Sequence, residues 1–173
     1  MKSILIYSLL VLVVAATSGC GFQLRGEADL PVAMQSTHLQ IADPGSDFAR
    51  GLERSLQRAG VNLVDNNSAA TATLDIPVNR ISQEILSIGA NSRVREFSIR
   101  HNVTFRLLDD KGNEIITSQH LELSRPLSFD ESEILASSRE QEFVRQELAQ
   151  TMVRQVMLRL AQISVTTSDA DKS

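Results

Sequence analysis

The sequence has no tryptophan, and only 4% of its 173 residues are aromatic. Proteins that bind carbohydrate or single-stranded nucleic acid by stacking need exposed aromatic rings, so this composition argues against both classes. The formal net charge is −4, and a mildly acidic chain is not expected to bind nucleic acid. A local basic patch for an anionic lipid is still compatible with this overall charge.

Motifs of catalysis and metal binding are also absent from the sequence. There is one cysteine, Cys20, so the chain forms no internal disulfide and no cysteine metal cluster. The histidines His38, His101 and His120 are far apart and show no metal-ligand spacing. No GxSxG, P-loop or HExxH motif is present. We therefore expect a protein that is not an enzyme, with no metal site and no dissociable cofactor.

The N-terminus carries the features of an export signal. Residues 1–19 combine a basic Lys2 with an apolar stretch over residues 4–16 and a run of small residues before Cys20. The apolar stretch is shorter than the roughly 20 residues that a transmembrane helix needs. A lone cysteine is usually a small buried hydrophobe, but this one directly follows the export-like segment. Residues 1–19 are therefore predicted to be a signal peptide.

The sequence around Cys20 resembles the lipobox of bacterial lipoproteins. That pattern prefers leucine three residues before the cysteine, where this chain has Thr17. The resemblance implies that Cys20 carries N-acyl and S-diacylglycerol lipid, and two or more acyl chains anchor a protein stably to a membrane. Gly21 follows the cysteine where inner-membrane lipoproteins have aspartate. By resemblance to that sorting rule, we expect an anchor in the outer membrane.

The mature chain divides into three predicted segments. Residues 20–35, punctuated by glycine and proline, are predicted to form an extended tether. Residues 36–163 are predicted to form one domain, because the roughly 150 residues that follow the signal peptide are enough to bury a core. Residues 164–173 are polar and are predicted to be a disordered tail.

Two segments of the domain show helical periodicity. In the first, Phe48, Leu52 and Leu56 recur on one face, between Ser46 as N-cap and Gly60 as C-terminal stop. The second is a long amphipathic helix over residues 132–163. Its apolar face is predicted to contain Val144, Leu148, Met152, Val153, Val156, Leu160 and Ile163.

Alternation of apolar and polar residues predicts strands over residues 37–42, 74–85, 97–107 and 114–123. The second of these changes phase, which predicts a bulge near Asn79, and Pro77 lacks the N–H that a strand pairing requires. In the last strand, Ile115, Leu121 and Leu123 are predicted to share the buried face. The order of elements predicts an α+β two-layer sandwich. Its sheet is mostly antiparallel, with about four strands and two helices on one face.

Residues 20–26 read CGFQLRG directly after the lipobox, and this start resembles the LptE family of lipopolysaccharide-assembly lipoproteins. The resemblance extends over the mature chain through the tether, the strand before a capped helix, the long hairpins and the C-terminal amphipathic helix. It implies a protein that sits in the lumen of the outer-membrane β-barrel LptD and assists assembly of that barrel. It also implies a part in inserting lipopolysaccharide into the outer leaflet, with direct binding of lipopolysaccharide. Residues 20–26 are otherwise read as a flexible tether without specific contacts.

Four arginines on and near one predicted hairpin are candidate lipopolysaccharide contacts: Arg93, Arg95, Arg100 and Arg106. The guanidinium fork makes bidentate hydrogen bonds to phosphate. A solvated sheet face, or contacts to the barrel wall, would explain the same residues. Arg93 and Arg95 have the opposite parity to Arg100 and Arg106, so a regular strand cannot place all four on one face.

His101 falls on the apolar face of its strand and is interpreted as a hydrogen-bonded core residue. A second function stays open at this point, in which the chain is an outer-membrane lipoprotein adaptor, or pilotin, of a different envelope complex. A lipid-anchored hydrolase has no supporting set of residues in the sequence.

Overall fold

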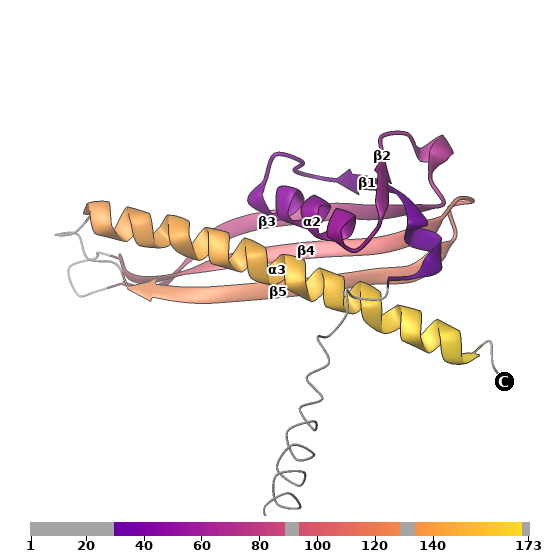
Figure 1. Ribbon diagram of the computed structural model, residues 1–173. Coiled ribbons are helices and arrows are strands. Elements are labelled where there is room, and N and C mark those ends of the chain that lie inside the picture. Colours follow the sequence, from indigo (N-terminus) through magenta and orange to yellow (C-terminus); the bar gives the residue numbers. More distant parts are fainter. Residues whose placement is uncertain (1–29, 89–93, 129–133, 171–173) are drawn as a thin grey trace, which may run out of the picture.

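The computed structural model describes residues 30–88, 94–128 and 134–170, and two helices cover one face of a five-stranded sheet (Figure 1). The strands are β1 (Ser36–Ile41), β2 (Asn62–Val64), β3 (Ala72–Ile88), β4 (Val94–Asp109) and β5 (Glu114–Ser128). The helices are α2 (Asp47–Arg58) and α3 (Ile134–Ala170), with short 3₁₀ turns η1 (Val32–Gln35) and η2 (Asn67–Ala69). The predicted α+β two-layer architecture is confirmed.

The strand order is β2-β1-β3-β4-β5, and the pairings of β3 with β4 and of β4 with β5 are antiparallel. β1 pairs in parallel with both β2 and β3. β2 is the fifth strand, and its three residues lie in a segment too short to show alternation. Only the start of β3, residues 72–76, pairs with β1. Beyond residue 76, β3, β4 and β5 therefore continue as a long three-stranded blade (Figure 1).

The predicted bulge in β3 is present, two to three residues before Asn79. The pairing with β4 shifts register between Asp75 and Val78, which spans Pro77. A bulge leaves a residue without its ladder partner, so the missing N–H of proline costs nothing there. Past residue 76, β3 pairs only with β4, so Pro77 lies both at the bulge and on the edge of the blade.

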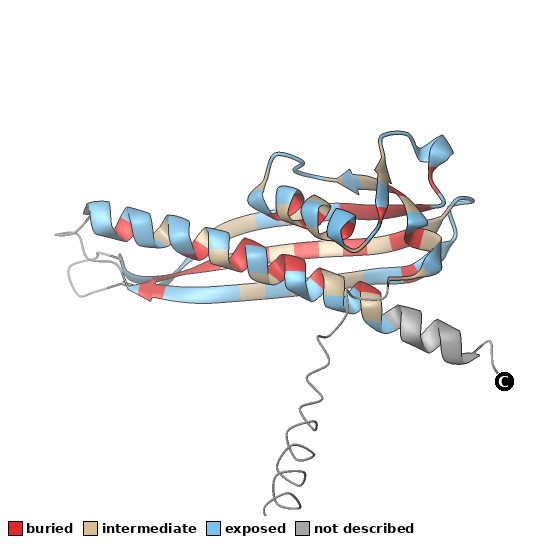
Figure 2. Ribbon diagram, in the orientation of Figure 1, coloured by how far each residue is buried: buried red, intermediate tan, exposed pale blue. Residues whose placement is uncertain are grey.

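Burial follows the alternation of β4 over residues 97–107, except at Ser98, which is also buried. Phe97, Ile99, Val103, Phe105 and Leu107 are all buried under the helices (Figure 2). The prediction for β5 is wrong at one position, because Ile116 is buried and Ile115 is exposed. The register shifts between the Phe105–Gln119 and Leu107–Ile116 pairs. This irregularity reverses the phase between Ile116 and Leu121, which strict alternation cannot anticipate.

The β4–β5 hairpin turns at Asp109. The carboxylate of Asp109 accepts hydrogen bonds from the backbone N–H groups of Lys111 and Asn113, at 2.9 and 2.7 Å, and from the Asn113 amide at 2.8 Å. The bonds from Asn113 are the main reason that the pKa of the Asp109 carboxyl is lowered. Gly112 closes the turn with φ of 84°, a conformation that favours glycine.

Helix α2 begins and ends where its sequence predicts. The Ser46 hydroxyl accepts a hydrogen bond from the backbone N–H of Ala49 at 3.2 Å, which satisfies one of the free donors of the first turn. Gly60 follows the helix with φ of 82° and stops it. Phe48, Leu52 and Leu56 are buried against the sheet, each contributing about 1.5–3 kcal/mol.

Helix α3 packs beside α2 on the same face of the sheet (Figure 1). Its buried residues include Val144, Leu148, Met152, Val153, Val156 and Leu160, as predicted. The helix continues to Ala170, so residues 164–170 are helical rather than an irregular tail. These residues include no glycine and no proline, and nothing in them forces a helix to stop.

The predicted tether also ends earlier than residue 35. Met34 is 1% exposed and belongs to the core, and Leu30 and Ala33 pack against it. Hydrogen bonds hold this segment, since the hydroxyls of Thr37 and Thr71 donate to the carbonyls of Met34 and Ala33 at 2.8 and 2.6 Å. The 3₁₀ turn is therefore part of the folded domain.

Candidate functional site

Several of the predicted functional residues lie outside the described residues. These are Cys20 with the signal peptide and the CGFQLRG segment, and Arg93 of the basic group. Of the four candidate arginines, the structure describes Arg95, Arg100 and Arg106, all on β4.

Arg100 lies between carboxylates on both neighbouring strands. Its Nη2 is 2.8 Å from Oε2 of Glu84 on β3, and its Nη1 is 3.2 Å from Oε1 of Glu122 on β5. The side chain of Arg100 is one-third exposed. A phosphate at this position would therefore have to displace two carboxylates that already bind the guanidinium.

Arg106 is held in a similar way nearer the β4–β5 turn. Its Nε donates to Oδ2 of Asp75 at 2.8 Å, and its Nη1 lies 3.7 Å from Oε1 of Glu114. The side chain of Asp75 is only 11% exposed, so its charge depends on this partner. Arg106 therefore neutralises a carboxylate that the fold has largely removed from water.

These ion pairs belong to an open face, which is the face of the blade turned away from α2 and α3. The register places on it polar residues from three strands, with Val78 and Pro126 as its apolar members. The polar members are Arg80, Ser82, Glu84, Ser98, Arg100, Asn102, Thr104, Arg106, His120, Glu122 and Ser124. The open face is thus a hydrated surface of mixed charge.

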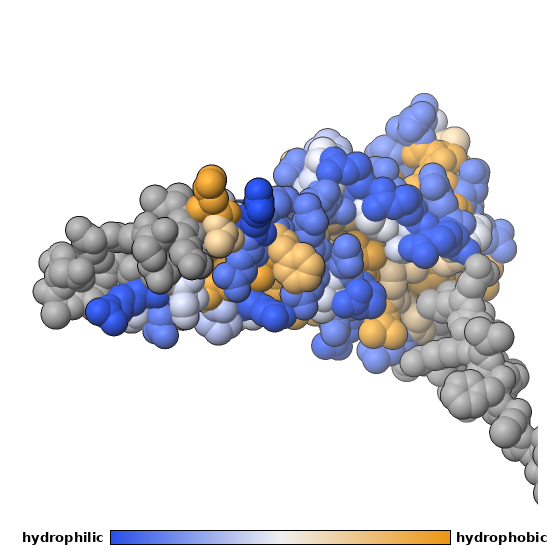
Figure 3. All heavy atoms as spheres, turned by 60° about the vertical axis from the view of Figure 1, so that its left-hand side comes forward, coloured by the Kyte–Doolittle hydropathy of each residue, from blue (hydrophilic) through white to orange (hydrophobic). Residues whose placement is uncertain are grey.

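Exposed apolar side chains gather toward one end of the molecule. We define the distal end as the end of the blade where β3 finishes and β4 starts, next to the start of α3 (Figure 1). Ile85 and Leu86 on β3 are 58% and 54% exposed, and Leu135 and Phe143 on α3 are 80% and 64% exposed. Arg95 is exposed in the same region. Figure 3, which brings this end forward, shows apolar surface between hydrophilic patches.

His101 is a buried core residue, as predicted. Its Nε2 donates to Oδ1 of Asn79 at 2.9 Å, and the Asn79 amide donates to the Ser46 hydroxyl at 2.9 Å. The ring of Phe48 packs edge-on against the imidazole with centroids 5.4 Å apart. Burial lowers the pKa of His101 to about 4, and the carbonyl of Leu148 opposes part of that shift. His101 is therefore neutral at physiological pH and links the start of α2 to the sheet.

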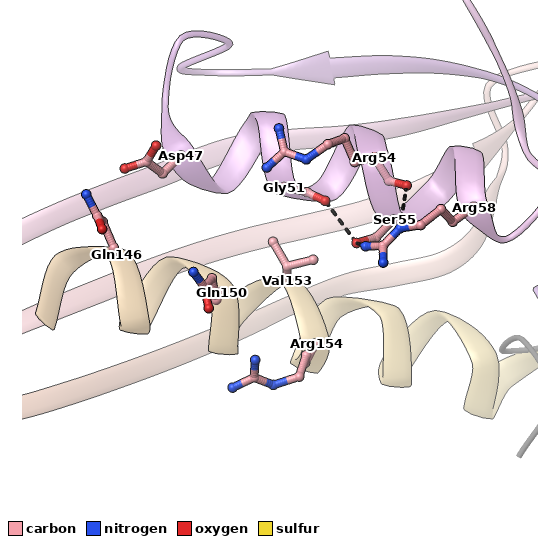
Figure 4. Close-up of a pocket in the computed structure, with 9 residues that line it drawn as sticks. All are labelled: Asp47, Gly51, Arg54, Ser55, Arg58, Gln146, Gln150, Val153 and Arg154. Carbon is pink, nitrogen blue, oxygen red and sulfur yellow. Dashed lines mark hydrogen bonds between the residues drawn. The ribbon is translucent and has the colours of Figure 1, made fainter. Parts of the chain in front are cut away.

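A groove of about 640 Å³ runs between α2 and α3 on the outer side of the helical layer (Figure 4). Arg54 and Arg58 line it from α2, and Arg154, Gln146 and Gln150 line it from α3. Spacing of four residues predicts that Arg54 and Arg58 share a face of their helix, but only the packing of the two helices brings Arg154 to the same groove. No sequence pattern predicts the groove or the exposure of the apolar residues Ile85, Leu86 and Phe143.

Within the described ranges, no group of three or more His, Cys, Asp or Glu residues is arranged to hold a metal ion. Among the described helices, none combines the length and the hydrophobicity needed to cross a membrane.

Comparison with known proteins gives consistent results for sequence and fold. The family model "LptE: Lipopolysaccharide-assembly" matches residues 34–160. The LPS-assembly lipoprotein LptE of Yersinia pestis (strain Pestoides F) is 33% identical over 174 residues, which cover 95% of this chain and 81% of that protein.

Solved structures of bacterial lipoproteins share the fold. Uncharacterized lipoprotein B from Nitrosomonas europaea matches with a TM-score of 0.68 and 29% identity, covering 86% of this chain and 93% of that one. Rare lipoprotein B from Shewanella oneidensis matches with a TM-score of 0.64 and 20% identity, covering 77% and 98%. At 20% identity, the similarity to the Shewanella oneidensis protein shows the fold alone.

Proposed function

The chain belongs to the LptE family of lipopolysaccharide-assembly lipoproteins, and we propose its function from that premise. It plugs the lumen of the LptD β-barrel, assists the assembly of that barrel and takes part in inserting lipopolysaccharide into the outer leaflet. Its lipid on Cys20 anchors it to the outer membrane, and the folded domain lies on the periplasmic side within the barrel lumen.

The open face is the observation that carries the plug proposal. A barrel wide enough to pass a glycolipid has a polar, water-filled interior. The open face presents polar side chains from three strands, and its charges are largely balanced by the Arg100 and Arg106 ion pairs. Such a surface can lie against a polar wall and keep both its water and its internal pairs.

The distal end is the part of the domain best suited to lipopolysaccharide. A glycolipid offers acyl chains and phosphate groups, and this end combines exposed apolar side chains with the exposed Arg95. Arg100 and Arg106 already have carboxylate partners within 4 Å. Of the described arginines in the predicted group, we therefore assign the first contact with lipopolysaccharide to Arg95.

Depletion of the protein in its host tests the plug proposal. We expect loss of mature LptD and of surface lipopolysaccharide. Loss of an assembled secretin with normal surface lipopolysaccharide would instead favour the adaptor or pilotin function. No feature of the described residues favours that alternative over the family function.

Substitutions at the distal end test the lipopolysaccharide contact separately. Arg95→Ala combined with Leu86→Ser is expected to weaken binding of lipopolysaccharide to the purified protein by about tenfold, while co-purification with LptD is retained. The matched control is Arg80→Ala combined with Val78→Ser, which changes an exposed arginine and a partly exposed apolar residue on the open face. Equal losses in both variants would refute a specific role for the distal end.

A further inference from the structure

The groove between α2 and α3 has an apolar floor and polar walls. A Cβ atom placed on Gly51 would lie 3.1 Å from Cγ2 of Val153, so the two helices are in close contact at this point. Val153 is 6% exposed and forms the apolar part of the lining (Figure 4). Glycine at position 51 lets α3 approach the α2 backbone, and the long polar side chains on both sides then enclose the groove.

The charge of the groove has the opposite sign to that of the chain. The chain has a formal net charge of −4, yet Arg54, Arg58 and Arg154 line this one groove. The lining includes one carboxylate, Asp47, and Arg50 already neutralises it at 2.6 Å. Within the lining, the three guanidinium charges therefore have no unpaired carboxylate to balance them.

The three groove arginines differ from the four arginines of the domain that are paired with carboxylates. Arg50, Arg100, Arg106 and Arg125 each form a salt bridge with a carboxylate. Within the part of the chain that the structure describes, no salt bridge involves Arg54, Arg58 or Arg154.

Neutral oxygens hold two of these guanidinium groups against their own helices. Arg58 donates from Nε to the Arg54 carbonyl at 3.2 Å and from Nη2 to the Ser55 hydroxyl at 3.1 Å. Arg154 donates from Nη2 to the Thr151 hydroxyl at 2.7 Å. Each guanidinium has five N–H donors, so most of them stay available to an anion.

We propose that this groove is a binding site for phosphate groups, held by Arg54, Arg58 and Arg154. The guanidinium fork matches the tetrahedral oxygens of a phosphoryl group, and the amides of Gln146 and Gln150 supply further donors from α3. The volume of about 640 Å³ falls within the range of small-ligand sites and exceeds what a bare phosphate needs. The same chemistry is offered by the headgroup of a phosphorylated lipid and by free inorganic phosphates.

This site is separate from the distal end and from the open face, which are the two surfaces that carry the proposed function. It lies on the outer side of the helical layer, whereas the open face lies on the opposite side of the sheet (Figure 1). Its test can therefore fail while the proposed function stands, and the reverse is also true.

The test uses the full lipidated chain in a nonionic detergent and follows ligand phosphorus signals by ³¹P NMR. One arm adds inorganic pyrophosphate, and the other adds phosphatidic acid to the micelles, with phosphatidylcholine as an internal reference. The groove variant carries R54Q, R58Q and R154Q. The matched control carries R80Q, R139Q and R159Q, which removes three positive charges at exposed arginines that do not line the groove.

We expect the groove variant to lose at least tenfold in affinity, while the control stays within about twofold of the wild-type chain. Loss of pyrophosphate binding alone would identify a free anion as the ligand, and loss of phosphatidic acid binding alone would identify a lipid headgroup. Equal weakening in both variants, or unchanged binding in the groove variant, would overturn the proposal. Displacement of phosphate by acidic polypeptide at lower concentration would also overturn it.

A second variant guards against an effect on folding. R54K, R58K and R154K together keep the charge and remove the forked geometry. We expect this variant to retain binding weaker than wild type and stronger than the glutamine variant. Far-UV circular dichroism of all variants should match the wild-type spectrum, because Arg54, Arg58 and Arg154 are exposed.

Discussion

The buried His101 should make the stability of the domain depend on pH in a defined window. The pKa of this imidazole is about 4 in the folded chain, against 6.5 as the ordinary value. Below pH 6.5 the unfolded chain binds a proton on His101 that the folded chain does not bind until about pH 4. Unfolding therefore becomes easier as the pH falls through this window.

The size of the effect follows from the two pKa values. Each unit of difference between the two pKa values lowers the free energy of unfolding by about 1.36 kcal/mol once the pH is below both of them. At a pH between the two values, part of this loss is already present. Between pH 7.5 and pH 4.5 the expected loss is about 2.5 kcal/mol of unfolding free energy. The physical cause is burial, because the imidazole is fully buried beside Phe48 and is hydrogen-bonded to Asn79.

Urea unfolding of the mature chain at a series of pH values measures this loss. Far-UV circular dichroism is the appropriate probe, since the sequence has no tryptophan and its one tyrosine, Tyr7, lies in the predicted signal peptide. His101→Gln removes the titrating group, so its stability should vary much less between pH 6.5 and 4.5. His120→Gln, at an exposed position, should keep the wild-type dependence.

Equal pH dependence in wild type and His101→Gln would refute the reasoning, because it would place the titrating group elsewhere. Titration of Asp109 does not contribute to the pH dependence in this window. The lowered pKa of its carboxyl contributes stability that is lost only as the pH falls below about 3.8, outside this window.

Four further substitutions have expected effects on stability, each measured by urea unfolding at pH 7.5. Gly51→Leu should destabilise the domain by about 1–3 kcal/mol through overpacking against Val153. A stability within about 0.3 kcal/mol of wild type, which is roughly the error of the method, would show that α3 can move away. Ser46→Ala should cost about 1–2 kcal/mol, because it removes both the N-cap of α2 and the acceptor for Asn79; no loss would contradict the cap. Arg106→Ala should cost about 1–3 kcal/mol by leaving Asp75 without its partner, whereas Arg100→Ala should cost less than about 1 kcal/mol, because its carboxylates are well exposed. The reverse order would contradict the assignment of Asp75 as the dependent charge.

The sequence predicts those features that depend only on residues close together along the chain. The N-cap at Ser46, the stop at Gly60 and the buried face of β4 follow from a hydroxyl, a glycine and strict alternation, and the structure confirms all three. Met34 was wrongly placed in the tether because its burial depends on the core beneath it. Strict alternation places Ile115 on the buried face, but Ile116 is buried instead, because a register shift depends on the partner strand.

The functional surfaces were less predictable for the same reason. The sequence groups the four arginines of the hairpin by their proximity along the chain, but cross-strand pairing decides that Arg100 meets Glu84 and Glu122. No periodicity in one strand contains that information. The arginine groove likewise depends on how α3 crosses α2 at Gly51.

One measurement tests the plug proposal most directly. Tagged protein is purified from membranes in mild detergent, and the co-purifying partners are identified and quantified by mass spectrometry. The account predicts a β-barrel of the LptD type in stoichiometric amount. Recovery of the protein alone, or together with a secretin, would contradict the plug proposal and leave a lipid-anchored adaptor in its place.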